Sequence, residues 1–270
     1  MQDDPRRDPN PVPRAGPRRR LNALQVAVLA AALALGFAAG SLRKHEPEPA
    51  KTAAAPPKVR PRAPASHEPR LATFRDAQPT PDVRQVADWV VDSGDNHGKA
   101  IVIVDKKDAR VWVLDPRGGY VADTPALLGA AIGDDPVPGI GDKPLSEVLP
   151  QEKTTPAGRF EAELGENANH EDVVWVSWDL AVSMHRVRPL VKSEQRLERL
   201  ASPTNEDNRI SFGCINLPPP FYEQVLHPVV QAMGAVIYVL PETRTPQQQF
   251  GMHDLAGRLA LVPASTLAVK

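Results

Sequence analysis

The feature that constrains this chain most is an uncharged apolar run near its N-terminus. No charged side chain lies between Arg20 and Arg43, and the run from Leu21 to Leu42 is rich in alanine and leucine. A helix needs roughly 20 apolar residues to cross a bilayer, and this run is just long enough. Arginines at 18–20 precede it, and excess arginine holds its flank in the cytoplasm. We therefore expect a single-pass signal anchor in the cell inner membrane, with the rest of the chain periplasmic.

A cleaved signal peptide is the alternative interpretation, because Ala38-Ala39-Gly40 resembles a small-residue cleavage site. Under either interpretation the C-terminal part is exported. The sequence then divides into a basic cytoplasmic N-terminus (1–20), a transmembrane anchor (21–42), a proline-rich linker (43–81), a catalytic domain (82–242) and a C-terminal tail (243–270). Proline-rich chain is extended and semi-rigid, so the linker is expected to hold the domain away from the membrane.

Composition excludes several classes of function. The formal net charge is −1, so bulk electrostatics provide no argument for nucleic acid as a partner. A single cysteine rules out an internal disulfide and a cysteine-rich zinc site. The seven histidines show no HExxH-type ligand spacing. We therefore expect no metal and no other cofactor.

The segment 82–242 alternates short β-branched runs with few helical patterns, which indicates a mainly β domain, either a sandwich or a small barrel. The long segment from Gly133 to Pro156 is expected to be a functional loop. The helix expected at 192–201 places Leu197 and Leu200 inward. Strands are expected at 101–104, 111–114, 126–132, 159–164, 173–178, 181–185, 210–214 and 235–240, and helices at 83–91, 192–201 and 218–233. The first two strands, which are β-branched runs, are expected to form a hairpin.

The single cysteine, Cys214, is the candidate nucleophile, because a lone thiol in an exported domain suggests that its chemistry is used. The thiolate rather than the thiol attacks, so Cys214 needs a partner that takes its proton. His185 ends an expected strand and can meet Cys214 if the two strands are neighbours. Gly213 permits a sharp turn, and the helix opening at Pro219 is expected to direct its positive end toward the loop, although that field fades within one turn. The alternative is that Cys214 is a small buried hydrophobic residue.

Three segments in this order resemble the catalytic domain of the L,D-transpeptidase (YkuD-type) family. Thr154 to Phe160 is similar to the TPxGxF element that precedes a strand. Met184-His185 is similar to the histidine that ends a strand, and Ser211 to Asn216 is similar to the Ser-His-Gly-Cys-hydrophobic-Asn/Arg signature. The resemblance covers about Lys99 to Glu242.

The resemblance implies a β-sandwich-like fold with the cysteine in a cleft. It implies that Cys214 attacks a peptidoglycan stem tetrapeptide, releases D-Ala and forms a thioester, which an amine on a second stem or a lipoprotein resolves. His185 would be the general base, and the backbone amides of Gly213 and Cys214 would stabilise the oxyanion. Ser211 and Asn216 would orient the loop or the substrate, and capping of the following helix is the equal alternative for Asn216.

The chain departs from the family pattern in two places. Phe212 stands where the family usually has histidine. The segment from Pro189 to Arg209 lengthens the separation between His185 and Cys214, and it could form a lid or a partner-binding flap. Within and before it, Arg209, Arg186 and Arg188 are candidates for binding a substrate carboxylate. Arginines at such positions are more often solvated or in structural ion pairs.

Three functions remain open from the sequence. The first is a membrane-anchored cysteine acyltransferase of the L,D-transpeptidase type. The second is an amidase or carboxypeptidase in which water resolves the same thioester. The third is a non-catalytic module that binds or scaffolds the cell wall, which Phe212 favours and an intact Cys–His pair disfavours.

Overall fold

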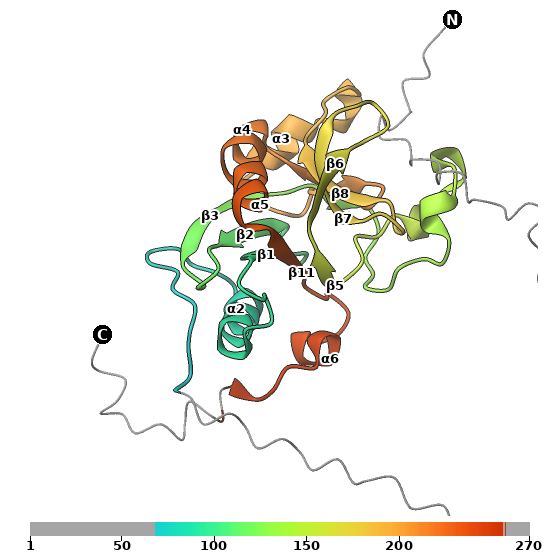
Figure 1. Ribbon diagram of the computed structural model, residues 1–270. Helices are drawn as coiled ribbons and strands as arrows, with labels where there is room; N and C mark the ends of the chain where they lie inside the picture. The colour runs from blue at the N-terminus through green and yellow to red at the C-terminus, as the bar shows by residue number, and fades with distance from the viewer. Residues whose placement is uncertain (1–67, 256, 258–270) are drawn as a thin grey trace, which may run out of the picture. The chain divides into compact units, whose positions relative to one another are not determined.

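The structure is a computed structural model that describes residues 68–255 and residue 257 (Figure 1). The predicted anchor at 21–42, the basic segment before it and most of the predicted linker lie outside the described residues. In the described part of the chain, no helix combines the length and the apolar character needed to span a bilayer.

A five-stranded sheet forms one layer, in the order β3-β2-β1-β11-β5. β1 and β11 are parallel, and the other neighbouring pairs are antiparallel. The hairpin expected from the two β-branched runs is confirmed as β1 and β2. The bounds are Ala100–Asp105 (β1), Arg110–Leu114 (β2), Tyr120–Pro125 (β3), Gly158–Glu161 (β5) and Ala235–Val239 (β11).

Helix α2 (Pro81–Ser93) covers one face of this sheet, and its local sequence explains both of its ends. The Thr80 hydroxyl accepts a hydrogen bond from the Val83 N–H, and Pro81 suits the first helical position. Gly94 ends the helix in the left-handed conformation at φ 71°. The helix predicted at 83–91 is therefore confirmed, with slightly longer bounds.

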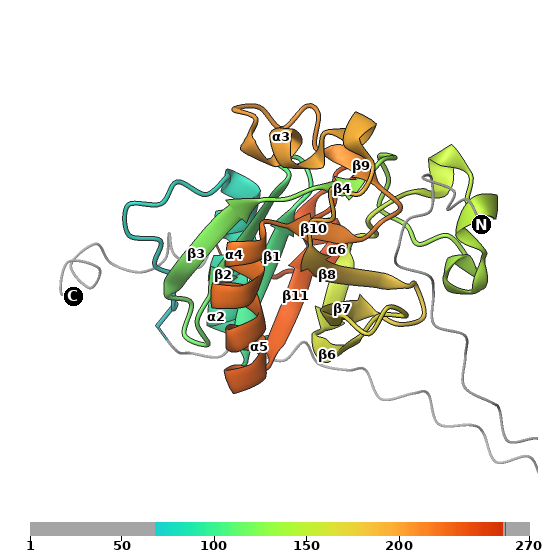
Figure 2. The same ribbon diagram turned by 90° about the horizontal axis from the view of Figure 1, so that it is seen from above.

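A four-stranded sheet in the order β10-β8-β7-β6 forms the second layer (Figure 2). β8 and β10 are parallel, and the segment between them is longer than the dozen or so residues that a parallel crossover needs. A two-stranded parallel pair, β4 with β9, lies beside β10. The bounds are Leu128–Gly129 (β4), Glu163–Glu166 (β6), Asp172–Ser177 (β7), Val182–Arg186 (β8), Arg209–Ser211 (β9) and Ile215–Leu217 (β10).

The main core lies between the two larger sheets and under the helical segment that follows β10. Alternate residues of each strand enter it, such as Val102 and Val104 from β1 and Met184 from β8. The helical segment is α4 (Pro219–Phe221), a π-helical turn (Tyr222–Leu226) and α5 (His227–Met233), and it supplies Tyr222 and Leu226. The remaining helices are α3 (Arg196–Ala201), α6 (Pro246–Phe250) and 3₁₀ turns at Ile140–Asp142, Leu145–Glu147, Pro150–Glu152 and Lys192–Glu194. The expectation of a mainly β domain with few short helices is confirmed.

Three local expectations were wrong. The third strand is β3 rather than 126–132, where only Leu128–Gly129 forms a strand and Leu127 and Ala131 make isolated β-bridges. The strand expected at 159–164 divides at Ala162 into β5 and β6, which belong to different sheets. In the helix expected at 192–201, Leu200 is buried but Leu197 is 48% exposed, because the helix buries Arg196 instead.

Residues at both ends of the predicted catalytic domain also pack onto it. Phe74, in the predicted linker, contacts Trp112 edge to face. Phe250, in the predicted tail, stacks on Trp89 and meets Tyr238 edge to face. The packed body therefore extends beyond 82–242 on both sides.

A buried cation ties four separate segments together at the end of β1. The Lys106 ammonium, with no exposed side-chain surface, donates to Asp134 Oδ1 at 2.8 Å and to the carbonyls of Gly133 and Thr155. Burial alone raises the pKa of Asp134. The hydrogen bonds from Lys106, the Thr243 hydroxyl and two backbone N–H groups hold that pKa below its ordinary value. Asp134 is therefore ionised at neutral pH, and its contribution to stability is lost as the pH falls below about 4.

We predict that Lys106→Met lowers the free energy of unfolding by about 3–5 kcal/mol at pH 7, because it leaves the buried Asp134 carboxylate without its cation. Urea unfolding followed by tryptophan fluorescence measures the loss. Lys99→Met is the matched control, because its ion pair with Glu161 is exposed and contributes under about 1 kcal/mol. Equal effects of the two substitutions would contradict a structural role for the buried pair.

Candidate active site

The register of β8 with β10 determines which side chains share a face. Ile215 lies beside Met184, and Asn216 lies beside His185. Ile215 and Met184 enter the core, so the alternation of strands places His185 and Asn216 on the opposite face. Cys214 immediately precedes β10, at the position beside Ser183, and therefore lies on that same face.

The Cys214 sulfur lies over the start of β8. Its Sγ is 3.7 Å from the Ser183 hydroxyl and 3.6 Å from the Ala181 carbonyl oxygen. From strand geometry, the Cα atoms of Cys214 and His185 are about 8 Å apart on the diagonal between the strands, within reach of both side chains. Cys214 is half-buried and reduced. The structure thus brings the predicted nucleophile and base to one face of neighbouring strands, outside the apolar core.

The hydrogen bond at one ring nitrogen defines the tautomer of neutral His185. Its Nδ1 lies 2.8 Å from the backbone carbonyl oxygen of Arg186. Since a carbonyl only accepts hydrogen bonds, Nδ1 carries the proton, and the lone pair of the neutral ring is on Nε2. In this tautomer Nε2 is the ring nitrogen that can accept a proton.

The turn that carries Cys214 is held from both sides. The Ser211 hydroxyl donates to the Cys214 carbonyl at 2.6 Å and accepts from the Gly213 N–H at 3.0 Å. On the other side, the buried Thr155 hydroxyl donates to the Gly213 carbonyl and accepts from the Gly129 N–H, both at 2.9 Å. Ser211 and the Thr154–Phe160 element therefore position the turn.

Gly213 contributes its conformation rather than the oxyanion donor that the family resemblance implied. Its N–H is donated to Ser211 and is not directed at a substrate. Its φ is +133°, which side chains rarely adopt, and a Cβ atom there would lie 2.7 Å from the Thr154 carbonyl oxygen. Only glycine fits this approach of the turn to Thr154.

Asn216 lies within β10 and does not cap the helix that follows, whose N-cap position is Pro218. Its Oδ1 accepts a hydrogen bond of 2.7 Å from Arg196 Nη1, and its Nδ2 lies 3.4 Å from the Cys214 carbonyl oxygen. Arg196 is buried and also pairs with Glu194. Nothing in the sequence distinguished Arg196 from the other charges of the segment 189–209.

The two arginines predicted to bind substrate are engaged within the protein. Arg186 pairs with Asp172 and Glu223, and it points to the opposite face of β8 from His185. Arg209 pairs with Glu242 and donates to the Lys106 carbonyl. Both are engaged in ion pairs, and a role for either in binding substrate stays a prediction. Arg188 pairs with Glu171.

The segment 189–209 is fastened to the domain rather than open. Leu200 packs with Leu127 and Val187 in a small separate cluster. The Asn208 side chain donates to the Ala126 carbonyl. These contacts, with the Arg196 bond to Asn216, dock the segment beside the β8–β10 face.

The helix after β10 is too far away to act on the sulfur. Cys214 lies at the start of β10 and the helix begins after its end, so the strand separates them by about 10 Å. Because the field of a helix end fades within about one turn, the expected support from the helix at Pro219 was wrong.

Phe212 packs where the long loop meets β8. It lines a cavity of about 20 Å³ with Leu180, Val182 and residues of the loop, and the Lys153 ammonium lies 3.9 Å from its ring centroid.

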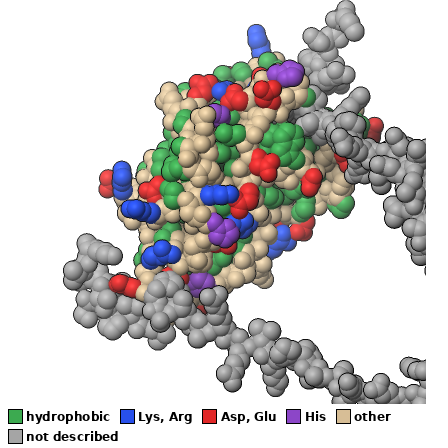
Figure 3. Space-filling view, viewed as in Figure 1, with side chains coloured by type: hydrophobic (Ala, Val, Ile, Leu, Met, Phe, Trp, Pro, Cys, Tyr) green, Lys and Arg blue, Asp and Glu red, His purple; other side chains and the backbone are tan. Residues whose placement is uncertain are grey.

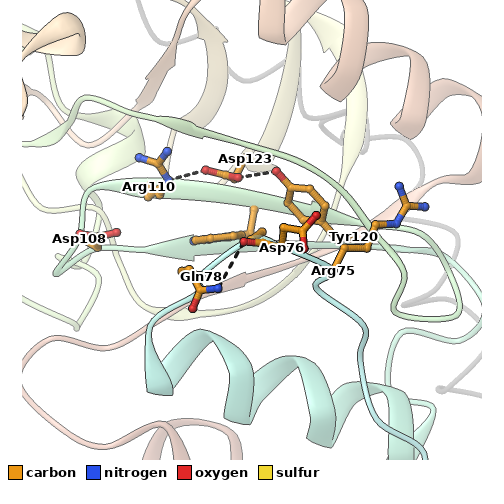
Figure 4. A pocket seen from close by; sticks show the side chains of 9 residues that line it. Arg75, Asp76, Gln78, Asp108, Arg110, Tyr120 and Asp123 are labelled. Carbon is orange, nitrogen blue, oxygen red and sulfur yellow. Dashed lines mark hydrogen bonds and ion pairs between the residues drawn. The ribbon is translucent and has the colours of Figure 1, made fainter.

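A larger pocket of about 540 Å³ lies elsewhere, on β2, β3 and the segment 75–78 (Figure 4). There Asp123 accepts from Arg110 and from the Tyr120 hydroxyl, and neither Cys214 nor His185 lines it.

The described residues hold no cluster of three or more histidine, cysteine, aspartate or glutamate side chains arranged for a metal ion. Acidic and basic side chains are interspersed on the face shown in Figure 3, in keeping with the small net charge.

Comparisons with known proteins extend the family resemblance to solved structures. A scan against protein-family models and a search of curated proteins find no match. Solved structures that match this chain include several L,D-transpeptidases. One from Mycobacterium smegmatis is 17% identical at a TM-score of 0.30, over 52% of this chain and 58% of that one. The match thus spans little more than half of that protein.

Two further structures are similar. The catalytic domain of the E. faecium L,D-transpeptidase is 18% identical at a TM-score of 0.30, over 53% of this chain and 98% of that one. The helical cell shape determining protein Pgp2 from Campylobacter jejuni is 14% identical at a TM-score of 0.32, over 58% of this chain and 55% of that one. At TM-scores near 0.3, the case for function must come from the geometry of the site.

We predict that Gly213→Ala lowers the free energy of unfolding by at least about 3 kcal/mol, because it combines backbone strain with a clash against Thr154. Gly98→Ala is the matched control and should cost about 1 kcal/mol, since Gly98 has φ +74° and a methyl group there would meet nothing within 4 Å. Thermal unfolding of both variants checks the difference. If the two substitutions lower the free energy of unfolding equally, the close approach to Thr154 is not the reason that position 213 is glycine.

Proposed function

We propose that this protein is a cysteine acyltransferase of the L,D-transpeptidase type that acts on peptidoglycan stem peptides. The observation that carries the proposal is the placement of Cys214 and His185 on one face of two neighbouring parallel strands. The order of the three sequence segments supports it, and the matching solved structures include proteins named L,D-transpeptidases.

The chemistry follows from the tautomer of His185. Its Nε2 takes the proton of the Cys214 thiol, and the thiolate attacks the carbonyl carbon of the bond between the diamino acid and the terminal D-Ala. The tetrahedral intermediate collapses as the C–N bond breaks, and the imidazolium returns its proton to the leaving D-Ala amine. The donor peptide remains as a thioester on Cys214. The Cys214 N–H stays the predicted donor to the oxyanion.

The second half of the reaction sets the product. An amine on a second stem attacks the thioester, His185 removes its proton, and the new amide bond releases the thiolate. If water attacks instead, the same protein is a carboxypeptidase. A non-catalytic cell-wall module would form no thioester at all.

We also propose that the uncharged run at 21–42 anchors the protein in the inner membrane and that the proline-rich linker carries the domain into the periplasm. Arginine before the run and proline after it support this arrangement. Alkaline phosphatase fused after the run should be active, because the fused enzyme would lie in the periplasm. An inactive fusion would show that the chain after the run stays in the cytoplasm.

We predict that imipenem, which is bound in one of the similar solved structures, adds once to the reduced full-length protein, at Cys214. The thiolate opens the lactam ring, so the mass increases by that of the whole drug. Intact-mass and peptide mass spectrometry locate the adduct, and Cys214→Ala is the control. A folded, reduced protein that forms no adduct and releases no D-Ala would favour the non-catalytic module.

We predict that His185→Gln slows thioester formation by at least ~10²-fold, the usual effect of losing a general base. Ser183→Ala is the comparison, because Ser183 also lies beside the sulfur but is not assigned proton transfer. Stopped-flow or quenched-flow acylation by the stem tetrapeptide measures both rates. Unchanged acylation in His185→Gln would place the base on another residue.

A further inference from the structure

We propose that Lys153, held over the ring of Phe212, binds the C-terminal carboxylate of the donor stem peptide. This inference rests on the proposed function and adds a substrate-selecting residue to the same site. It also gives a reason for the phenylalanine that replaces the usual histidine of the family signature.

The ring of Phe212 and the Cys214 sulfur share one corner of the domain. The two residues are separated only by Gly213, so their Cα atoms are at most about 7 Å apart. The sulfur lies 3.6 Å from the Ala181 carbonyl oxygen, and the neighbours of Ala181 on both sides, Leu180 and Val182, line the small cavity with Phe212.

Lys153 is fixed to this corner through its backbone. Its carbonyl accepts a 2.9 Å hydrogen bond from the Ala131 N–H. The next carbonyl along the chain, that of Thr154, lies against Gly213. The side chain then places its ammonium 3.9 Å from the Phe212 ring centroid. Lys153 is therefore positioned beside the turn that carries the nucleophile.

Within the described part of the chain, Lys153 differs from Arg186, Arg196 and Arg209 in having no carboxylate partner. Among the described residues, no aspartate or glutamate lies within ion-pair distance of its ammonium, whereas Arg186, Arg196 and Arg209 are all paired. The adjacent Glu152 is taken up by Lys143, at 2.6 Å, and by the Leu149 N–H.

A ring face attracts an ammonium without neutralising it. Phe212 contacts one side of the Lys153 ammonium, and an ammonium has three N–H donors. The remaining donors can hydrogen-bond a carboxylate of opposite charge. Phe212 therefore orients the cation while leaving its charge for the ligand.

The substrate brings the matching anion to the same place. In a peptide with a terminal D-Ala, the carboxylate carbon is three bonds from the scissile carbonyl carbon. A cation that selects this substrate must therefore lie close to the nucleophile, and Lys153 lies over the ring of the residue two positions before Cys214. The selection applies to the donor, because the acceptor enters after D-Ala has left.

The test compares two synthetic stem tetrapeptides, one ending in D-Ala with a free carboxylate and one ending in the D-Ala carboxamide. Release of the terminal residue gives kcat/KM for each peptide with the full-length protein. Binding of each peptide to the Cys214→Ala protein, measured by calorimetry, does not require turnover. The variants are Lys153→Met, which removes the charge, and Lys153→Arg, which keeps it. Lys192→Met is the control, because Lys192 is an exposed lysine of the segment 189–209.

We expect the wild-type protein to prefer the carboxylate peptide by at least ten-fold and Lys153→Met to lose that preference by weakening only the carboxylate peptide. Lys153→Arg and Lys192→Met should keep it, and Phe212→Leu should reduce it through KM. An unchanged preference in Lys153→Met overturns the inference while the transferase activity stands. If Lys153→Met lowers kcat/KM equally for both peptides and shifts the pH profile, Lys153 acts on the ionisation of the Cys214 thiol and does not bind the substrate carboxylate.

The binding arm separates this inference from the proposed function. If no turnover occurs but the Cys214→Ala protein prefers the carboxylate peptide through Lys153, the inference stands and the enzymatic proposal fails. If neither turnover nor binding discriminates between the two peptides, the inference is overturned.

Discussion

The parallel pairing of β8 with β10 is the contact on which the candidate site depends. Pairing of Ile215 with Met184 sends these two residues into the core, and the same register sends His185 and Asn216 to the other face. A shift of one residue would turn the histidine into the apolar core and turn the two core residues out of it. The apolar side chains of β8 and β10 thus stabilise the fold and, by alternation, determine where the thiol and imidazole meet.

The turn between β9 and β10 needs support that the strands alone do not provide. Thr155 bonds the Gly213 carbonyl, and the Thr155 carbonyl in turn accepts from the buried Lys106. The Ser211 hydroxyl bridges the Gly213 N–H and the Cys214 carbonyl within the turn. A buried cation at the end of the first strand is therefore linked, through one threonine, to the backbone beside the nucleophile. Polar groups so deeply buried are stable only when all of them are paired.

Two departures from the family signature acquire physical roles in the structure. The segment 189–209 docks through Leu200 and places the Arg196 guanidinium on Asn216. Phe212 packs against the long loop and seats the Lys153 ammonium. The first contacts Asn216 of β10, and Phe212 stands two residues before Cys214. Both departures therefore bear on the surroundings of Cys214 and His185.

Much of the fold could be predicted from local patterns. The β-branched runs predicted the first hairpin, Thr80 and Pro81 fit the start of α2, and Pro219 fits the helix after β10. Failures arose where burial and secondary structure diverge. The apolar run at 126–132 is buried only over its first four residues and forms only a two-residue strand, whereas the more polar β3 pairs as an edge strand.

The sequence by itself determined the chemistry available to this protein: one thiol, a glycine before it, and a histidine at the end of a strand. Only the tertiary structure decided how that chemistry is arranged. Charges show this most clearly, since Arg186, Arg209 and Lys153 look alike in sequence, yet the first two are consumed by ion pairs. The reason is that a charge interacts with whatever the fold brings within a few ångströms, and those neighbours come from segments far apart along the chain.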